Sequence, residues 1–173
     1  NHYDPQELIL TTNFPNAVVN VRTQDGLFNS TFNITNTSPT NVTLPLDLIQ
    51  TQNINTVENS KGLIITSNNP INAAYKISAY YNQDIMVLKG ASAMGYSFYG
   101  GSQTRLNSSK DPRDDERHFI GIIASEDQTQ VTIKSPVKLE GVSGNNPTVN
   151  ITLDQGETYV VTTEENAKKS VTG

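Results

Sequence analysis

Cysteine and tryptophan are absent from this 173-residue chain, and histidine occurs only at His2 and His118. Without cysteine the chain has no disulfide, no zinc ribbon, no iron–sulfur ligation and no thiol nucleophile. One histidine is next to the terminus and the other lies between Arg117 and Phe119, where we interpret it as a residue at a strand rim. Nucleophilic catalysis with an acid–base relay generally needs a histidine beside Ser or Thr. We therefore expect no enzyme.

Basic clusters and long apolar runs are missing as well. The chain has 12 basic and 17 acidic residues, a net charge of −5, and no group of Lys and Arg that could follow a phosphate backbone. No apolar run approaches the roughly 20 residues that a membrane-spanning helix needs. We expect neither nucleic acid as a partner nor direct membrane insertion. Residues 1–5 do not resemble a signal peptide, and we expect a mature or excised soluble segment.

Neutral polar residues are abundant instead. Asn, Thr and Ser make up 54 of the 173 residues, whereas only 17% are charged. Thr favours strands and Asn and Ser favour turns, so this composition predicts an all-β protein rich in loops. Disorder is the alternative, but Val, Ile, Thr, Tyr and Phe recur in short bounded runs, which disordered segments lack.

Apolar residues alternate with polar ones along most of the chain. Two runs of this kind, residues 8–10 and 19–21, flank a turn-forming stretch at residues 13–16, and we interpret them as a hairpin. Residues 28–34 and 42–46 flank a second turn at 36–40 and predict another hairpin. No stretch keeps a helical period long enough to predict a helix.

The second part of the chain resembles the first. At an offset of 112 positions, Leu8 and Leu10 correspond to Ile120 and Ile122, and Val19 and Val21 correspond to Val131 and Ile133. Further on, residues 41–44 match 150–153 and residues 58–61 match 165–168. We interpret this as a duplication, although alternating strands also resemble one another by chance. The strands that follow residue 62 in the first copy have no counterpart before residue 173.

The predicted fold is therefore all-β, with two tandem antiparallel β-sandwich-like units, the second incomplete at its C-terminal end. We expect a first unit over residues 1–100, a linker or long loop over 101–117 and a second unit over 118–173. The linker is polar, with Leu106 as its only large apolar residue. An unpaired sheet edge in the C-terminal half is the expected sign of the incomplete unit.

Two groups of residues are candidate ligand sites. Six aromatic residues lie between positions 75 and 99, and Tyr81, Tyr96 and Tyr99 are the ones we expect to be exposed as a platform for sugar or protein. The acidic part of the linker, with Asp111, Asp114, Asp115 and Glu116, could bind calcium through carboxylate oxygens. Arg113 and Arg117 partly neutralise that segment, so a solvated loop with local ion pairs is the alternative. We expect no other cofactor.

Several motifs resemble those of the IgGFc-binding-protein-like family. They are residues 57–71 (VENSKGLIITSNNPI), 84–88 (DIMVL), 94–96 (MGY), 119–133 (FIGIIASEDQTQVTI) and 151–159 (ITLDQGETY). The last two are similar to that family's "ATEDNTTVTI … LNAGETY" pattern. The resemblance implies an extracellular β-rich module within a large secreted or cell-surface protein. It concerns turns and core positions, and residues 100–117 match no part of the pattern.

Together these observations predict a non-catalytic interaction or scaffold module, extracellular or on the cell surface, with adhesion-type binding. Expected partners are protein or glycan surface ligands and other domains of the same large protein. The alternative is a carbohydrate-binding accessory domain or a fragment of a glycoside hydrolase. A cleft with two carboxylates at glycosidase separation would favour the hydrolase, and a shallow face with coplanar tyrosines would favour sugar binding.

Overall fold

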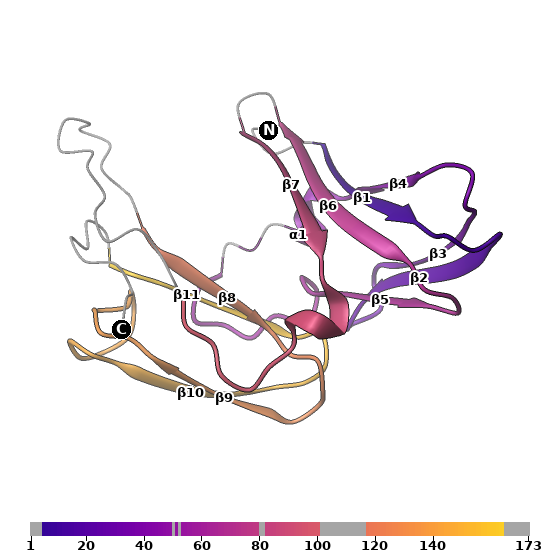
Figure 1. Ribbon diagram of the computed structural model, residues 1–173. Coiled ribbons are helices and arrows are strands. Elements are labelled where there is room, and N and C mark those ends of the chain that lie inside the picture. Colours follow the sequence, from indigo (N-terminus) through magenta and orange to yellow (C-terminus); the bar gives the residue numbers. More distant parts are fainter. Residues whose placement is uncertain (1–4, 50, 52, 80–81, 101–116, 165–173) are drawn as a thin grey trace. The chain divides into compact units, whose positions relative to one another are not determined.

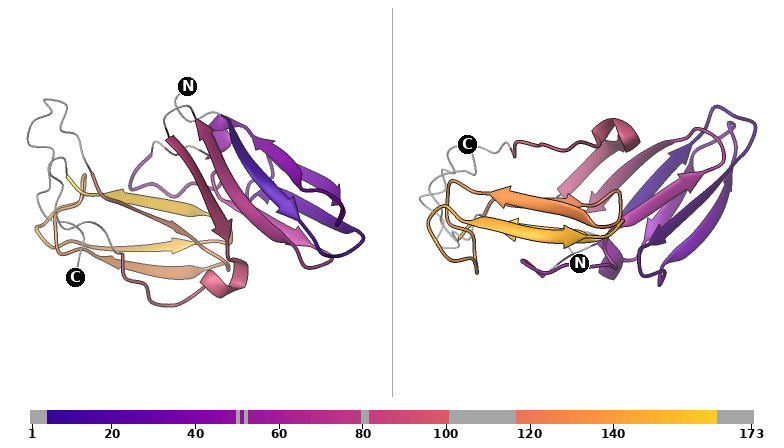
Figure 2. Two further views of the ribbon diagram at one scale, coloured as in Figure 1. Left: turned by 45° about the horizontal axis from the view of Figure 1, so that its top comes forward. Right: turned by 90° about the horizontal axis from the view of Figure 1, so that it is seen from below.

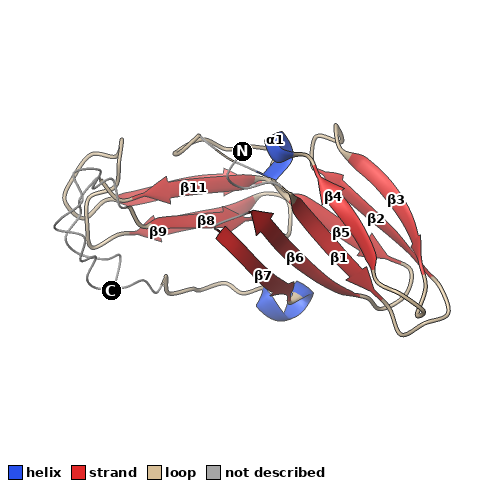
Figure 3. Cartoon of the chain, turned by 90° about the horizontal axis from the view of Figure 1, so that it is seen from above, coloured by secondary structure: helices blue, strands red, loops and turns tan. Residues whose placement is uncertain are grey.

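The computed structural model describes residues 5–49, 51, 53–79, 82–100 and 117–164 (Figure 1). The chain forms two compact units. Unit 1 contains residues 1–51 and 59–94, and unit 2 contains residues 52–58 and 95–173. Strands dominate the described residues, with only two helical turns of four residues each, α1 (Leu46–Ile49) and η1 (Gly90–Ala93) (Figure 3). The predicted all-β fold with antiparallel sheets is confirmed.

The described residues of unit 1 form two antiparallel sheets. The first contains, in spatial order, β4 (Thr40–Leu44), β1 (Gln6–Thr11), β6 (Asn72–Ala79) and β7 (Asn82–Leu88). The second contains β3 (Asn29–Ile34), β2 (Ala17–Thr23) and β5 (Leu63–Ser67). Pro45 directly follows β4, an edge strand, as expected for a residue without a backbone N–H.

Within its described residues, unit 2 has two pairs of antiparallel strands (Figure 2). One pair is β8 (Phe119–Ile123) with β11 (Thr158–Thr162), and the other is β9 (Thr129–Lys134) with β10 (Thr148–Leu153). Within residues 53–58, which belong to this unit, Asn55 and Glu58 bond to the outer edge of β11. Asn55 N–H donates to Val160 O at 2.8 Å, and Glu58 and Thr158 exchange backbone hydrogen bonds of 3.0 and 2.8 Å.

Each unit has its own apolar core between its sheets, which is the sandwich arrangement. Period-two alternation turns one side of each strand inward. The buried core of unit 1 draws on α1, on β1 and β4 of one sheet and on β2 and β3 of the other: Leu48, Leu8, Leu10, Val42, Leu44, Ala17, Val19, Val21 and Ile34. The buried core of unit 2 contains Ala124, Ile133, Leu139, Leu153, Tyr159 and Val161.

The two predicted hairpins are wrong. β1 pairs with β4 and β6, and β2 pairs with β3 and β5, so neither β1–β2 nor β3–β4 is a paired hairpin. Both connections instead carry the chain from one sheet to the other. Alternation is the same in a hairpin and in such a crossing, and the turn formers between the strands suit both.

The pairing scheme of unit 1 recurs in unit 2. β1 pairs with β4 and β2 with β3, just as β8 pairs with β11 and β9 with β10. At the offset of 112 positions, Ala17 of β2 corresponds to Thr129 of β9. Ala17 pairs with Ile34 of β3, and Thr129 pairs with Leu153 of β10. The pairing therefore places β10 in the position of β3. The sequence match of residues 41–44 with 150–153 is wrong, because residues 41–44 belong to β4. Duplication of the sequence itself stays a prediction.

Candidate binding surface

Three exposed aromatic side chains lie in unit 2, on the residues that come shortly after η1. Tyr96 is 107% exposed, Tyr99 94% and Phe98 72%, on residues 95–100, which we call the aromatic segment. Its two terminal glycines permit close contacts. A Cβ on Gly95 would lie 3.1 Å from Phe98 Cζ, and one on Gly100 would lie 3.0 Å from Ile120 Cδ1. Phe98 therefore folds back over Gly95, and Gly100 lies close to the Ile120 side chain of β8.

The other predicted aromatic positions differ. Tyr81 lies outside the described residues. Tyr75 is half-buried on β6, packs against the core of unit 1, and burial raises its pKa above the ordinary value of tyrosine. The structure thus describes Tyr96 and Tyr99 as exposed, and a ligand for them stays a prediction.

The predicted calcium ligands, namely Asp111, Asp114, Asp115 and Glu116, lie outside the described residues. Within the part of the chain that the structure does describe, no three His, Asp or Glu side chains gather as a metal site. Calcium binding by the acidic segment stays a prediction, to be tested by following the melting temperature during a Ca²⁺ titration.

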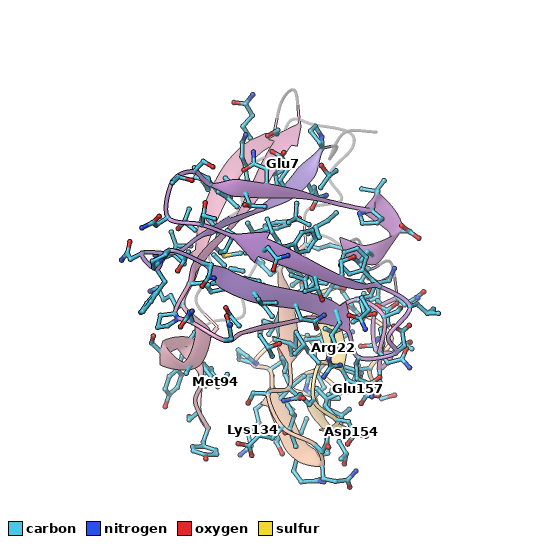
Figure 4. The ribbon with its side chains drawn as sticks, turned by 90° about the vertical axis from the view of Figure 1, so that its right-hand side faces the viewer. Glu7, Arg22, Met94, Lys134, Asp154 and Glu157 are labelled. Carbon is cyan, nitrogen blue, oxygen red and sulfur yellow. The ribbon has the colours of Figure 1, made fainter. Side chains whose placement is uncertain are left out.

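Carboxylates at one end of unit 2 hold two turns together. Asp154 Oδ1 accepts hydrogen bonds from the Gln128 backbone N–H at 2.9 Å and from its side-chain amide at 3.0 Å. Asp127 Oδ1 accepts from Gln155 N–H at 3.0 Å, and Glu157 Oε2 accepts from Asp154 N–H at 2.8 Å. We call this arrangement of the 124–128 and 154–157 turns the clasp, and two of its residues, Asp154 and Glu157, are labelled in Figure 4. The carboxylates of the clasp accept hydrogen bonds from backbone N–H groups and from a side-chain amide, which favours a structural role over acid–base chemistry.

A neutral polar ladder covers the outer side of one sheet in each unit. In unit 1, Asn20 Nδ2 donates to Asn29 Oδ1 at 2.8 Å and to Thr31 Oγ1 at 3.2 Å, across β2 and β3. In unit 2, Gln130 Nε2 donates to Thr152 Oγ1 at 3.0 Å, and Thr132 Oγ1 donates to Asn150 Oδ1 at 2.8 Å. Sequence reasoning missed both ladders. Alternate polar residues on paired strands are the signal, but it is readable only once the register is known.

His118 has the position expected of it. It is half-buried just before β8, and its backbone N–H donates to Thr163 Oγ1 at 3.1 Å. Thr163 N–H in turn donates to His118 O at 2.8 Å, so the residue extends the β8–β11 pairing.

Comparison with known protein families matches residues 83–173, more than half of the chain, to the family described as IgGFc binding protein. The chain belongs to this family. Comparisons with curated proteins and with solved structures gave no match. The IgGFc-binding family match begins in β7 and includes the aromatic segment and the four described strands of unit 2. The family match also includes both turns of the clasp. These turns lie within the motifs at residues 119–133 and 151–159, so the clasp gives those motifs a structural role.

Membership agrees with the resemblance inferred from the sequence. The IgGFc-binding family is one of non-enzymatic binding modules that are typically extracellular. This indicates a protein-binding module. Among the described residues, no helix has the length and apolar character needed to cross a membrane.

Proposed function

We propose that this chain is an interaction or scaffold module of an extracellular or cell-surface protein, acting by adhesion-type binding without turnover. The supporting observation is the aromatic segment, whose Tyr96, Phe98 and Tyr99 are exposed within the part matched by the family. Tyrosine and phenylalanine offer large contact areas at a small cost in side-chain entropy, and aromatic residues are enriched at interfaces.

The first partner to test is a protein surface. The family description names the Fc part of IgG, so immobilised Fc fragment is a defined probe. The variant Tyr96→Ala/Phe98→Ala/Tyr99→Ala should weaken Fc binding at least about 10-fold, measured by surface plasmon resonance. Leu27→Ala is the matched control, because Leu27 is 90% exposed on unit 1. Equal losses in both variants would contradict a role for the aromatic segment.

A glycan is the second candidate partner, favoured by two exposed tyrosines only three positions apart. Phenol rings stack on the apolar faces of sugars. A glycan array probed with the wild-type chain and with Tyr96→Ala/Tyr99→Ala distinguishes the two partners. Signal on sugars that the variant loses would assign the segment to glycans. A chain that binds neither Fc nor any arrayed glycan would count against both.

A further inference from the structure

In unit 1, the backbone hydrogen bonds of β2 show which neighbouring strand lies along each of its two edges. Alternate residues of an antiparallel strand bond to opposite neighbours. Thr23 N–H donates to Phe28 O on the β3 side at 2.9 Å, and Val18 O accepts from Asn68 N–H on the β5 side at 3.3 Å. Odd-numbered residues of β2 therefore bond to β3, and even-numbered residues bond to β5.

In β9, the described residues pair along only one of these two edges. Ser135 N–H, next to the end of the strand, donates to Pro147 O at 3.1 Å on the β10 side. Odd-numbered residues thus bond to β10. The backbone groups of Gln130, Thr132 and Lys134 are directed to the opposite edge, where no described strand pairs.

Among the described strands, β8 has an unpaired edge of the same kind. Ala124 N–H donates to Glu157 O at 3.1 Å, and Thr163 N–H donates to His118 O at 2.8 Å, so even-numbered residues bond to the β11 side. The backbone groups of the odd-numbered residues Phe119, Gly121 and Ile123 are directed to the other edge. Within the described residues, that edge has no paired strand.

In unit 1, the edges that correspond to the unpaired edges of β9 and β8 are paired with β5 and β6. These two strands belong to different sheets and are joined by residues 68–71, and we call them the arch. β5 pairs with β2, and β6 pairs with the odd-numbered side of β1, where Ser78 N–H donates to Pro5 O at 2.9 Å. The arch also covers the core, since Leu63, Ile65, Ala73 and Tyr75 pack against it.

Core side chains of unit 2 are more exposed than their counterparts in unit 1, as expected where no described arch covers them. Leu8, Leu10 and Val19 in unit 1 are 0–1% exposed. Their counterparts Ile120, Ile122 and Val131 are only partly buried, although Gly100 approaches Ile120. The free edge of β8 also lacks the charged residues or proline that normally protect an open edge, and Phe119 is 74% and Ile123 53% exposed.

We propose that the free edges of β8 and β9 receive a second arch, supplied by the same polypeptide on the C-terminal side of β11. Such an arch has two extended segments with apolar residues at every second position, joined by a short polar turn. Chain order supports this source, because the arch of unit 1 follows β4 and β11 occupies the position of β4. A connection as long as residues 45–62 would place this second arch after Gly173.

Appending an arch to the chain tests the proposal. A copy of residues 62–79 is joined after Gly173 through a flexible Gly/Ser linker, and hydrogen exchange of individual amides is followed by NMR. In the unmodified chain, the amides of Phe119, Gly121, Ile123, Gln130 and Thr132 should exchange rapidly. With the appended arch, they should exchange at least about 10-fold more slowly. The control carries Leu63→Asp, Ile65→Asp and Tyr75→Asp in the appended copy alone and should leave rapid exchange in place.

Three results would overturn the proposal. The first is slow exchange of these amides in the unmodified chain at low concentration. The second is protection that appears only as concentration rises, with dimers in analytical ultracentrifugation, which would assign the edges to a second copy of the chain. The third is an appended arch that leaves exchange at all five amides unchanged.

Discussion

Asp154 accepts two hydrogen bonds from Gln128, one from the backbone N–H at 2.9 Å and one from the side-chain amide at 3.0 Å. Gln128 has a φ of 55°, a left-handed conformation that is unfavourable for residues other than Gly. The two hydrogen bonds offset this local cost and connect the β8–β9 turn to the β10–β11 turn. Asp154 thus determines the path of a turn that lies 26 positions earlier in the sequence.

Removing this carboxylate should destabilise unit 2. We expect Asp154→Ala to lower its free energy of unfolding by about 1–2 kcal/mol, because two hydrogen bonds to a charged group are lost at a partly exposed site. Urea unfolding followed by NMR signals of unit 2 measures this change. Asp154→Asn keeps an acceptor oxygen and should cost less. Equal effects of the two substitutions would show that acceptor geometry is unimportant here.

The sequence predicted strand positions well and strand partners poorly. Alternation at Leu8 and Leu10, and at Val19 and Val21, correctly predicted which side chains are buried. The same alternation could not determine partners, because a short polar connection either pairs its two strands or passes between sheets. Partner choice depends on contacts far apart in the sequence, such as Leu8 with Tyr75 across β1 and β6.

The candidate surface was predictable only in part. Strand alternation predicts that about half of the aromatic residues between positions 75 and 99 face the core, and exposure was predicted for Tyr81, Tyr96 and Tyr99. The clasp was not predicted, because an aspartate in a turn has the same local sequence whether it is solvated or bonded to a distant turn. The polar ladders were missed for a similar reason, since Asn20 and Thr31 become neighbours only through the register of β2 and β3.

Gly141 provides a test of how Asn55 contributes to the stability of unit 2. It has a φ of +70°, and an added Cβ would lie 2.9 Å from Asn55 Nδ2, which donates to Glu140 O at 2.7 Å. Gly141→Ala should therefore destabilise unit 2 by about 2–3 kcal/mol through strain and displacement of Asn55. Gly26→Ala is the control, with a φ of +74° and no atom within 4 Å of the added Cβ, and it should cost about 1 kcal/mol in unit 1. Urea unfolding resolved by unit provides both values, and similar losses would show that the Asn55 contact adds nothing.

The unequal cores of the two units predict unequal effects of equivalent truncations. Leu10 is fully buried in unit 1, whereas its counterpart Ile122 is partly buried. Leu10→Ala should lower the free energy of unfolding of unit 1 by about 3–4 kcal/mol. Ile122→Ala should cost unit 2 about half as much, because less apolar surface returns to water. Urea titrations resolved by NMR signals of each unit measure the difference, and equal losses would contradict an open core in unit 2.

Alkaline pH should destabilise unit 2 through Tyr159. Burial raises the pKa of Tyr159 above the ordinary tyrosine value of 10.0, because the phenolate is unfavourable beside the apolar core. The folded state therefore holds the proton more tightly than the unfolded chain. The corresponding stabilisation is complete below pH 10 and is lost as pH rises through the raised pKa. Tyr159→Phe should reduce the loss of unfolding free energy between pH 8 and about pH 11, measured by urea unfolding of unit 2 at each pH. An identical alkaline loss in wild type and variant would exclude Tyr159 as its source.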